Sequence, residues 1–351
     1  MRNDPNAAML EGRVVQGLAA MGKHLASLGV KLPPTRRATT ASLAQARARL
    51  RMRGYRLGPS TATDADHLRL DATLSAALGL SLVDEMRAAV LHTRHLVLAL
   101  RVGARAHAAR GMSLEAMFLA TFSEGARARA LGILGRAEEL ADETRDPLAR
   151  GLAAAARGFV CASLGEWSAA ADTYARAASA LEPLAEGRVM LARLQALREG
   201  PLFYRGDLAA LLGHVTRERE RADSIGDHYT GMTMRTGLAG TLLLAHGDLA
   251  RAAAEIGRAE AEWAYGEELA HRGLLARAHL DLYKGDGVQA WRRVNEAWPR
   301  LAAARLLRAQ PVRVEAHHLR ARCAIAAAAT GARVEARIAD AEHDIGAIER
   351  E

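Results

Sequence analysis

The chain has 351 residues, 50% of them hydrophobic and 25% charged, a composition typical of folded soluble proteins that excludes intrinsic disorder. Alanine contributes 78 residues and the aromatic types only 14, and this excess of helix formers excludes a β-sandwich or β-barrel. The formal net charge is +8, but the 45 arginines are interleaved with acids, as between Arg217 and Arg221. Mixed charge of this kind is typical of solvated helix faces, so we do not expect nucleic-acid binding.

Residues 1–39 are predicted to form an N-terminal helix and a linker. The first ten residues contain Asp4 and Pro5 and lack an apolar core, so they do not read as a signal peptide. The pair Pro33-Pro34 indicates the linker, because proline cannot continue a helix. No apolar run approaches the ~20 residues that span a bilayer, so we expect a cytoplasmic protein with no membrane contact.

Residues 40–103 are predicted to form a divergent helical segment. Helical patterns lie roughly at 40–53, 64–78 and 82–101. The third pattern has a start signal, since Ser81 can cap the helix and Asp84 supplies the acid of a capping box.

A periodic glycine organises residues 104–300. The spacings are 40, 41, 41 and 38 residues between Gly125, Gly165, Gly206, Gly247 and Gly285. An acid follows four of them, in the strings LGEW, RGDL, HGDL and KGDG. Glycine adopts the left-handed backbone that ends a helix, and an acid just after it favours the next helix. Each glycine is therefore predicted to separate the two helices of a hairpin.

The helix after each glycine carries a repeated face. Positions 5, 9 and 12 after the glycine differ by 4 and 3 residues and so share one side of a helix. The outer two are mostly alanine and the middle one is larger, as in Ala170, Tyr174 and Ala177. Leu211 and Glu218 depart from this pattern in the third unit. The face predicts helices that approach each other closely.

This pattern of glycine, acid, alanine, large apolar residue and alanine resembles the tetratricopeptide repeat. Gly158 and Gly240, each seven residues before the unit glycine, match the small residue of that family's first helix. The resemblance implies an all-α fold, an α-α superhelix built as a solenoid of helical hairpins. The units have about 40 residues instead of the family's 34. Repeats are expected over 104–300 and capping helices over 301–351; an unrelated helical bundle is the alternative.

A wider resemblance covers most of the chain. It rests on the strings ARARLRMRG from Ala46, GLSLVD from Gly79, RHLVLALR from Arg94 and LYKGD from Leu282. These strings are similar to the helical C-terminal region of large serine/threonine-kinase signalling proteins from myxobacteria. The kinase and ATPase modules that precede that region in the family have no counterpart in this sequence. The resemblance implies a signalling context and transfers no catalytic residue.

The common catalytic motifs are not found in the sequence. There is no kinase motif set, no phosphate-binding loop and no Gly-x-Ser-x-Gly elbow. His92 and His95 are three residues apart, but no third ligand that zinc requires lies nearby. Asp340 and Asp344 are expected to be solvated in a terminal helix. We therefore predict no enzyme activity, no cofactor and no metal site.

The predicted function is a non-catalytic protein–protein interaction scaffold or sensor arm in kinase-linked bacterial signalling. The alternative is a small-molecule-sensing helical domain of a signalling ATPase or transcription regulator. A polar pocket in the concave groove favours the sensor, and a broad open surface favours the scaffold. Cys161 and Cys323 belong to no paired motif and are predicted to be buried thiols in a reducing compartment. The partner and the oligomeric state stay open.

The partner surface is predicted on the first helix of each hairpin. The tetratricopeptide resemblance implies groove positions 13, 10, 6 and 3 residues before each unit glycine. The first unit contributes Met112, Glu115, Leu119 and Phe122. The predicted partner-binding residues in later units are Phe159, Arg193, Phe203, Arg272 and His279. Aromatic and arginine side chains are favoured because they dominate interface hot spots. The alternative is that the groove is closed and these residues pack as core.

Overall fold

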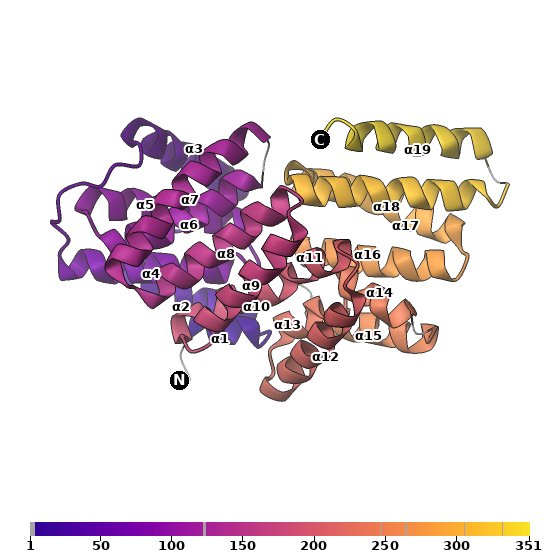
Figure 1. Ribbon diagram of the computed structural model, residues 1–351, viewed down its shortest axis with the longest axis horizontal. Helices are drawn as coiled ribbons and strands as arrows, with labels where there is room; N and C mark the ends of the chain where they lie inside the picture. The colour runs from indigo at the N-terminus through magenta and orange to yellow at the C-terminus, as the bar shows by residue number, and fades with distance from the viewer. Residues whose placement is uncertain (1–3, 122–123, 246, 264, 305, 332) are drawn as a thin grey trace. The chain divides into compact units, whose positions relative to one another are not determined.

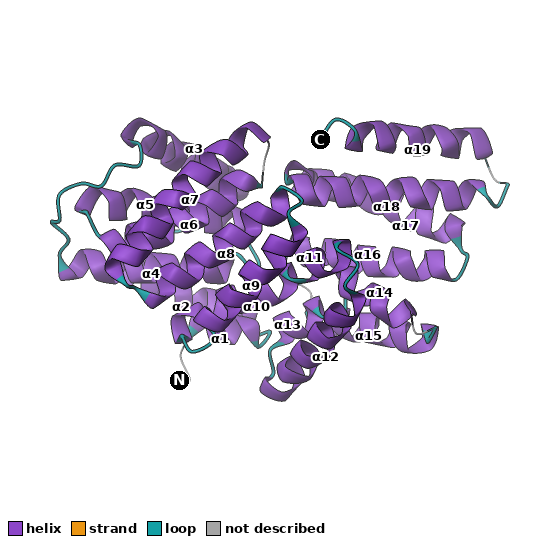
Figure 2. Cartoon of the chain, viewed as in Figure 1, coloured by secondary structure: helices purple, strands orange, loops and turns teal. Residues whose placement is uncertain are grey.

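The computed structural model describes the chain except residues 1–3, 122–123, 246, 264, 305 and 332. The chain is 81% helical, and the described residues form α-helices, two short 3-10 helices and no β-strand (Figure 2). The predicted all-α fold is therefore confirmed. No helix among the described residues combines the length and the hydropathy that a bilayer crossing requires.

The chain divides into two compact units, unit 1 (Met1–Gly206) and unit 2 (Asp207–Glu351), whose helices are labelled in Figure 1. Unit 1 contains α1 (Pro5–Leu10), α2 (Val14–Ser27), α3 (Arg36–Arg53), α4 (Asp64–Leu80), α5 (Glu85–Val102), α6 (Arg105–Ala120), α7 (Glu124–Thr144), α8 (Pro147–Ser163), α9 (Trp167–Leu181), η1 (Ala185–Gly187), α10 (Arg188–Leu197) and α11 (Glu199–Tyr204). Unit 2 contains α12 (Leu208–Ile225), α13 (His228–Thr233), α14 (Gly237–Ala245), α15 (Leu249–Glu262), α16 (Glu267–Tyr283), α17 (Gly287–Ala304), η2 (Leu306–Arg308), α18 (Gln310–Ala328) and α19 (Val334–Ile348).

Side-chain caps explain where the early helices begin. The Thr35 hydroxyl accepts a hydrogen bond from the Ala38 N–H, so α3 begins before residue 40. Asp84 accepts from the Arg87 N–H at 3.0 Å and is the N-cap of α5. The proposed cap Ser81 instead ends α4. The predicted segment limit at 103–104 coincides with the turn between α5 and α6, whereas those at 39–40 and 300–301 fall inside α3 and α17.

Sequence neighbours pair as hairpins in each unit. The pairs are α4 with α5, α6 with α7 and α8 with α9 in unit 1, and α16 with α17 and α18 with α19 in unit 2. Hairpins also pack on their neighbours within each unit, which is consistent with an α-helical solenoid. Four turn glycines have φ between 74° and 79°, namely Gly165, Gly206, Gly247 and Gly285. Their predicted helix-ending role is confirmed, whereas Gly125 lies inside the first turn of α7.

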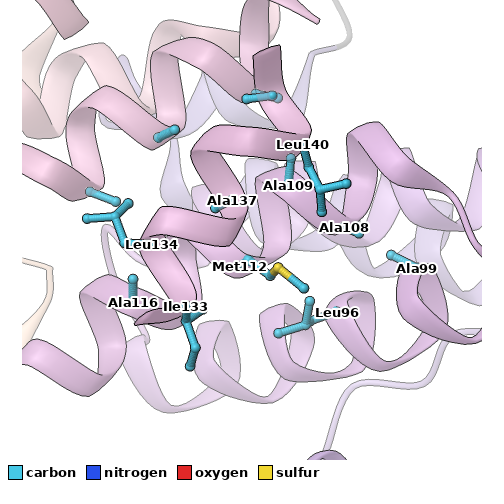
Figure 3. Packing of buried hydrophobic residues seen from close by; sticks show 14 of the residues in the cluster. Leu96, Ala99, Ala108, Ala109, Met112, Ala116, Ile133, Leu134, Ala137 and Leu140 are labelled. Carbon is cyan, nitrogen blue, oxygen red and sulfur yellow. The ribbon is translucent and has the colours of Figure 1, made fainter. Parts of the chain in front are cut away.

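The predicted repeated face is buried. Position 5 after the glycine is fully buried in all five sequence repeats, at Ala130, Ala170, Leu211, Ala252 and Ala290. Position 9 is also buried throughout, at Leu134, Tyr174, Val215, Ile256 and Val294. The close approach is clearest between α8 and α9, where a Cβ added to Gly158 would lie 2.5 Å from Cδ1 of Tyr174. Figure 3 shows the corresponding core of α5, α6 and α7 around Met112.

Two of the predicted first helices are interrupted. Between α10 and α11, Pro201 has no N–H to donate to the Leu197 carbonyl, and α10 ends at that residue. In unit 2, the break between α13 and α14 contains Arg235, whose side chain is 1% exposed. A helix broken here can turn its backbone so that a large side chain points inward.

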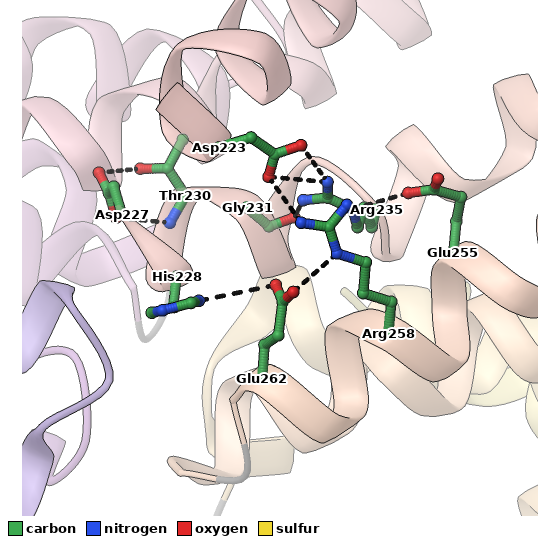
Figure 4. Close-up of polar contacts among 9 residues, drawn as sticks. All are labelled: Asp223, Asp227, His228, Thr230, Gly231, Arg235, Glu255, Arg258 and Glu262. Atoms are coloured by element: carbon green, nitrogen blue, oxygen red, sulfur yellow. Dashed lines mark hydrogen bonds and ion pairs between the residues drawn. The ribbon is translucent and has the colours of Figure 1, made fainter. Parts of the chain in front are cut away.

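Arg235 is held by groups from three helices (Figure 4). Its guanidinium donates to both carboxylate oxygens of Asp223 at 2.6 and 2.8 Å and to Glu255 at 2.7 Å. It also donates to the Gly231 carbonyl at 2.9 Å. A buried cation of this kind is tolerated only when its charge and its N–H groups are matched. The network therefore joins α12, α13 and α15 within unit 2.

The expectation that Asp344 is solvated is wrong. Its side chain is fully buried against α18, where His317 Nδ1 lies at 2.8 Å and Arg320 donates at 3.3 Å. Arg320 also lies over the Trp298 ring, 4.5 Å from its centroid. The burial arises because the terminal helix packs as the second arm of a hairpin. Cys161 and Cys323 are buried free thiols, as predicted.

Truncating the repeated face should destabilise unit 1. Leu134→Ala removes a fully buried side chain of α7, and we expect a loss of about 2–5 kcal/mol in unfolding free energy. Leu131→Ala on the same helix is the control, since Leu131 is 37% exposed, and should cost less than about 1 kcal/mol. Urea denaturation followed by circular dichroism measures both. Equal losses would contradict the assigned face.

Candidate functional site

A groove of about 850 Å³ lies in unit 1 and is the candidate functional site. It is lined by α1, α2, α4, Arg110 of α6, the start of α8, and η1 with the start of α10. Its floor consists of apolar side chains that are themselves almost fully buried, namely Met21, Leu25, Leu74, Leu148 and Val189. We call this hollow the unit-1 groove.

Asp146 organises the groove at the start of α8. Its carboxylate accepts from the Ala149 N–H at 2.6 Å, and so caps the helix, with Pro147 in the first helical turn. The same carboxylate accepts two hydrogen bonds from Arg110, at 2.6 and 3.0 Å. Burial alone would raise the pKa of Asp146, but these hydrogen bonds outweigh it and hold the pKa below its usual value. The Asp146 carboxylate is therefore ionised at neutral pH.

Asp71 of α4 adds a second carboxylate beside Arg110. Its Oδ1 lies 3.6 Å from Arg110 NH1 and 3.7 Å from His107 Nε2, and its side chain is 63% exposed. Burial and the Arg110 charge lower the pKa of His107 to about 4, so this imidazole is neutral at pH 7. Asp71 thus stays open to solvent beside a nearly buried guanidinium.

The five predicted partner-binding residues do not line the unit-1 groove. In unit 1, Phe159 packs against the hydrophobic core, and the Phe203 ring contacts Tyr204 with centroids 5.4 Å apart. Arg193 donates to the Ser81 carbonyl at 2.7 Å and so joins α10 to the end of α4. The three side chains thus contact different neighbours, and their role in partner binding stays a prediction.

In unit 2 the two predicted residues both lie on α16. Arg272 donates to the carbonyls of Thr233 at 2.9 Å and Thr236 at 3.3 Å, next to the break between α13 and α14. His279 Nε2 lies 3.4 Å from Arg322 of α18, and burial lowers the pKa of His279 to about 4. Both side chains make contacts inside unit 2 that the sequence did not suggest.

Most of the other predicted groove positions are in the core. Met112 and Leu119 are buried in α6, while Phe122 lies outside the described residues. The remaining position of that unit, Glu115, is fully buried. In the first sequence repeat, the face that the resemblance assigned to a partner therefore contacts neighbouring helices.

Glu115 is the centre of a buried polar cluster that the sequence did not reveal. Arg47 of α3 pairs with both of its oxygens, Tyr55 donates to Oε1 at 2.8 Å, and His92 Nε2 lies 3.2 Å from Oε2. Burial alone would raise the pKa of Glu115, but hydrogen bonds and charges from His92 and Arg47 lower it to about 2. The cluster joins α3, α5 and α6. The His92 imidazole, which the sequence analysis considered as a zinc ligand, therefore contacts the Glu115 carboxylate.

One sequence signal could have located the unit-1 groove. Asp4-Pro5 and Asp146-Pro147 are both an N-cap acid followed by proline at the first helical position. The signal marks helix starts, and helix starts in neighbouring hairpins come together at the groove. It does not reveal which starts are neighbours, because that depends on how the hairpins stack.

Comparisons with known proteins add no assignment. The sequence matches no protein-family model, and no curated protein matches it either. Within the described part of the chain, no group of three or more His, Cys, Asp or Glu side chains could hold a metal ion. The site is therefore interpreted from its own residues.

The Glu115 cluster should make stability depend on pH. Because the folded-state pKa of Glu115 is below its ordinary value, its contribution is complete above about pH 5 and is lost as the pH falls toward about 2. Glu115→Gln should cost about 3 kcal/mol at pH 7 and progressively less below pH 5. Urea titrations from pH 7 to pH 2 measure the difference.

Glu138→Gln is the matched control. Glu138 pairs with Arg157, but about a third of each side chain is exposed, so the loss should stay below about 1 kcal/mol. A loss for Glu115→Gln that is independent of pH would contradict the ionised cluster.

Proposed function

We propose that the chain is a non-catalytic interaction module whose unit-1 groove receives a short segment of a partner protein. The observation that supports this most directly is the groove itself, with its buried apolar floor and charged rim. The floor gives a bound segment apolar atoms to pack against. The rim residues Asp4, Glu186 and Arg188 are exposed, so the groove is open where a segment could enter and leave.

We also propose that, within each unit, the hairpins from α6 to α9 in unit 1 and from α13 to α17 in unit 2 are tetratricopeptide-like repeats. The left-handed turn glycines and the buried repeated faces support this proposal. The resemblance to the kinase-associated helical region supports the proposal that the module acts in a protein-phosphorylation pathway. In that setting the groove would bring a partner to a signalling complex.

The charged groups of the groove support a role without acid–base chemistry. A general acid or base works best with a pKa near the operating pH. The pKa of Asp146, which lines the groove, is lowered, and so is that of His107 beside Asp71, to about 4, so neither group is poised at neutral pH. Arg110 is engaged by Asp146. These groups position helices and shape the charge of the groove.

A small-molecule sensor is the second candidate. The groove volume of about 850 Å³ lies within the range of small-molecule sites, which favours this candidate. Such sites bury most of their ligand's surface, however, whereas the rim here is open. A peptide segment therefore suits the groove better.

Filling the groove should abolish peptide binding. Ala185 of η1 is exposed and lines the groove, so Ala185→Trp places an indole in it. Ala169→Trp on α9 is the control, since Ala169 is exposed and does not line the groove. A display library of random hexapeptides is selected on the purified chain. Selected peptides should bind the unmodified chain and Ala169→Trp, and lose at least tenfold in affinity for Ala185→Trp.

Two outcomes would overturn this proposal. Selected peptides that bind both tryptophan variants equally would place the peptide site elsewhere. A library that yields no binders, together with small molecules whose thermal stabilisation is blocked by Ala185→Trp, would establish the sensor instead.

A further inference from the structure

The unit-1 groove has an excess of negative charge, although the chain as a whole has a net charge of +8. Four carboxylates line it, from Asp4, Asp71, Asp146 and Glu186. Among the residues that the structure describes, two guanidinium groups do so, from Arg110 and Arg188. In a chain so rich in arginine, this local reversal needs a structural or functional reason.

Helix starts account for three of the four acids. Asp146 caps α8, and Asp4 caps α1 by accepting from the Asn6 N–H at 2.9 Å. Glu186 lies in η1, just before α10, where an acid interacts favourably with the N-terminal end of the helix dipole. Asp71 lies in the middle of α4, where no helix end requires it.

Among the described residues, no side chain of the groove fully matches the Asp71 charge. Arg110 directs its two short hydrogen bonds to Asp146, and its NH1 reaches Asp71 only at 3.6 Å. His107 lies at 3.7 Å and is buried. Asp71 therefore offers a solvent-open carboxylate beside the apolar floor. A long cationic side chain suits this combination, because its aliphatic stem covers apolar surface while its head stays at the charge.

We propose that the unit-1 groove selects partner segments carrying an arginine or lysine, whose cationic head pairs with Asp71 while adjacent apolar side chains cover the floor. This inference rests on the proposed function and adds the chemistry of the bound segment. Asp71 is a specificity-determining residue in this arrangement. Arg110 and Asp146 form the fixed base on which the Asp71 carboxylate is presented.

The test compares Asp71→Asn with Asp172→Asn. Asp172 is exposed on α9 outside the groove, so both variants lose one negative charge from unit 1. Hexapeptides selected on the unmodified chain should be enriched in arginine and lysine over aspartate and glutamate. The enrichment should persist with Asp172→Asn and disappear with Asp71→Asn. A thermal melt of each variant checks that it is folded.

Affinity measurements on individual peptides give the size of the arginine preference. For one selected peptide, replacing its arginine by glutamine should weaken binding to the unmodified chain about fivefold, as measured by fluorescence polarisation in 50 mM NaCl. The same replacement should change nothing with Asp71→Asn. Raising the salt to 500 mM NaCl should reduce the arginine preference, because the pair is partly exposed. Asp71→Lys should reverse the preference toward acidic peptides.

The outcomes separate this inference from the proposed function. Peptides that bind in the groove without charge preference would overturn the inference and leave the proposed function standing. Equal loss of preference in Asp71→Asn and Asp172→Asn would also overturn it, since the effect would then come from overall charge. A library without binders, with arginine amide alone stabilising the chain, would overturn both in favour of a small amine ligand.

Discussion

Close approach of paired helices is the constraint on which the rest of the structure depends. Gly158 against Tyr174 shows it most directly, since no side chain larger than hydrogen fits without movement. The fully buried alanines at position 5 after the turn glycines have the same effect in other hairpins. Helices that pack this closely bury a continuous face, although the chain has few aromatic residues to fill wider gaps. Their ends are then brought together, and the unit-1 groove lies among those ends.

Buried ion pairs complement this packing. Alanine-rich faces supply little apolar area per residue, and several helices are joined instead by charged side chains. Glu115 joins three helices of unit 1, Arg235 joins three helices of unit 2, and Asp344 joins the last hairpin. Each is matched by opposite charge or hydrogen bonds, without which its burial would be strongly destabilising.

The unit-1 groove combines the same two elements, close packing and matched charge. Its floor is an extension of the helix packing, and its rim contains the acids that helix starts require. Asp71 is the exception among these acids, since no helix start needs it. A groove built in this way has its shape and its charge set by the fold before any partner arrives. Preorganisation of this kind lowers the ordering cost of binding.

The sequence by itself determined the helical class, the hairpin turns and the buried face of each second helix. These are local properties: the left-handed backbone at Gly165 and the helical period that buries Ala170 and Tyr174 need no information from distant residues. The Asp-Pro pairs that begin α1 and α8, at Asp4 and Asp146, are local signals too, but they do not show that the two helix starts share a groove.

Only the tertiary structure decided the rest, because it depends on residues far apart in the chain. Glu115 meets Arg47 across 68 positions, and Arg193 meets the Ser81 carbonyl across 112. A helical period places such a side chain on a face, but it does not say whether that face meets water or another helix. For the same reason the predicted partner residues and the unit-1 groove differ, since the stacking of hairpins decides which surfaces remain open.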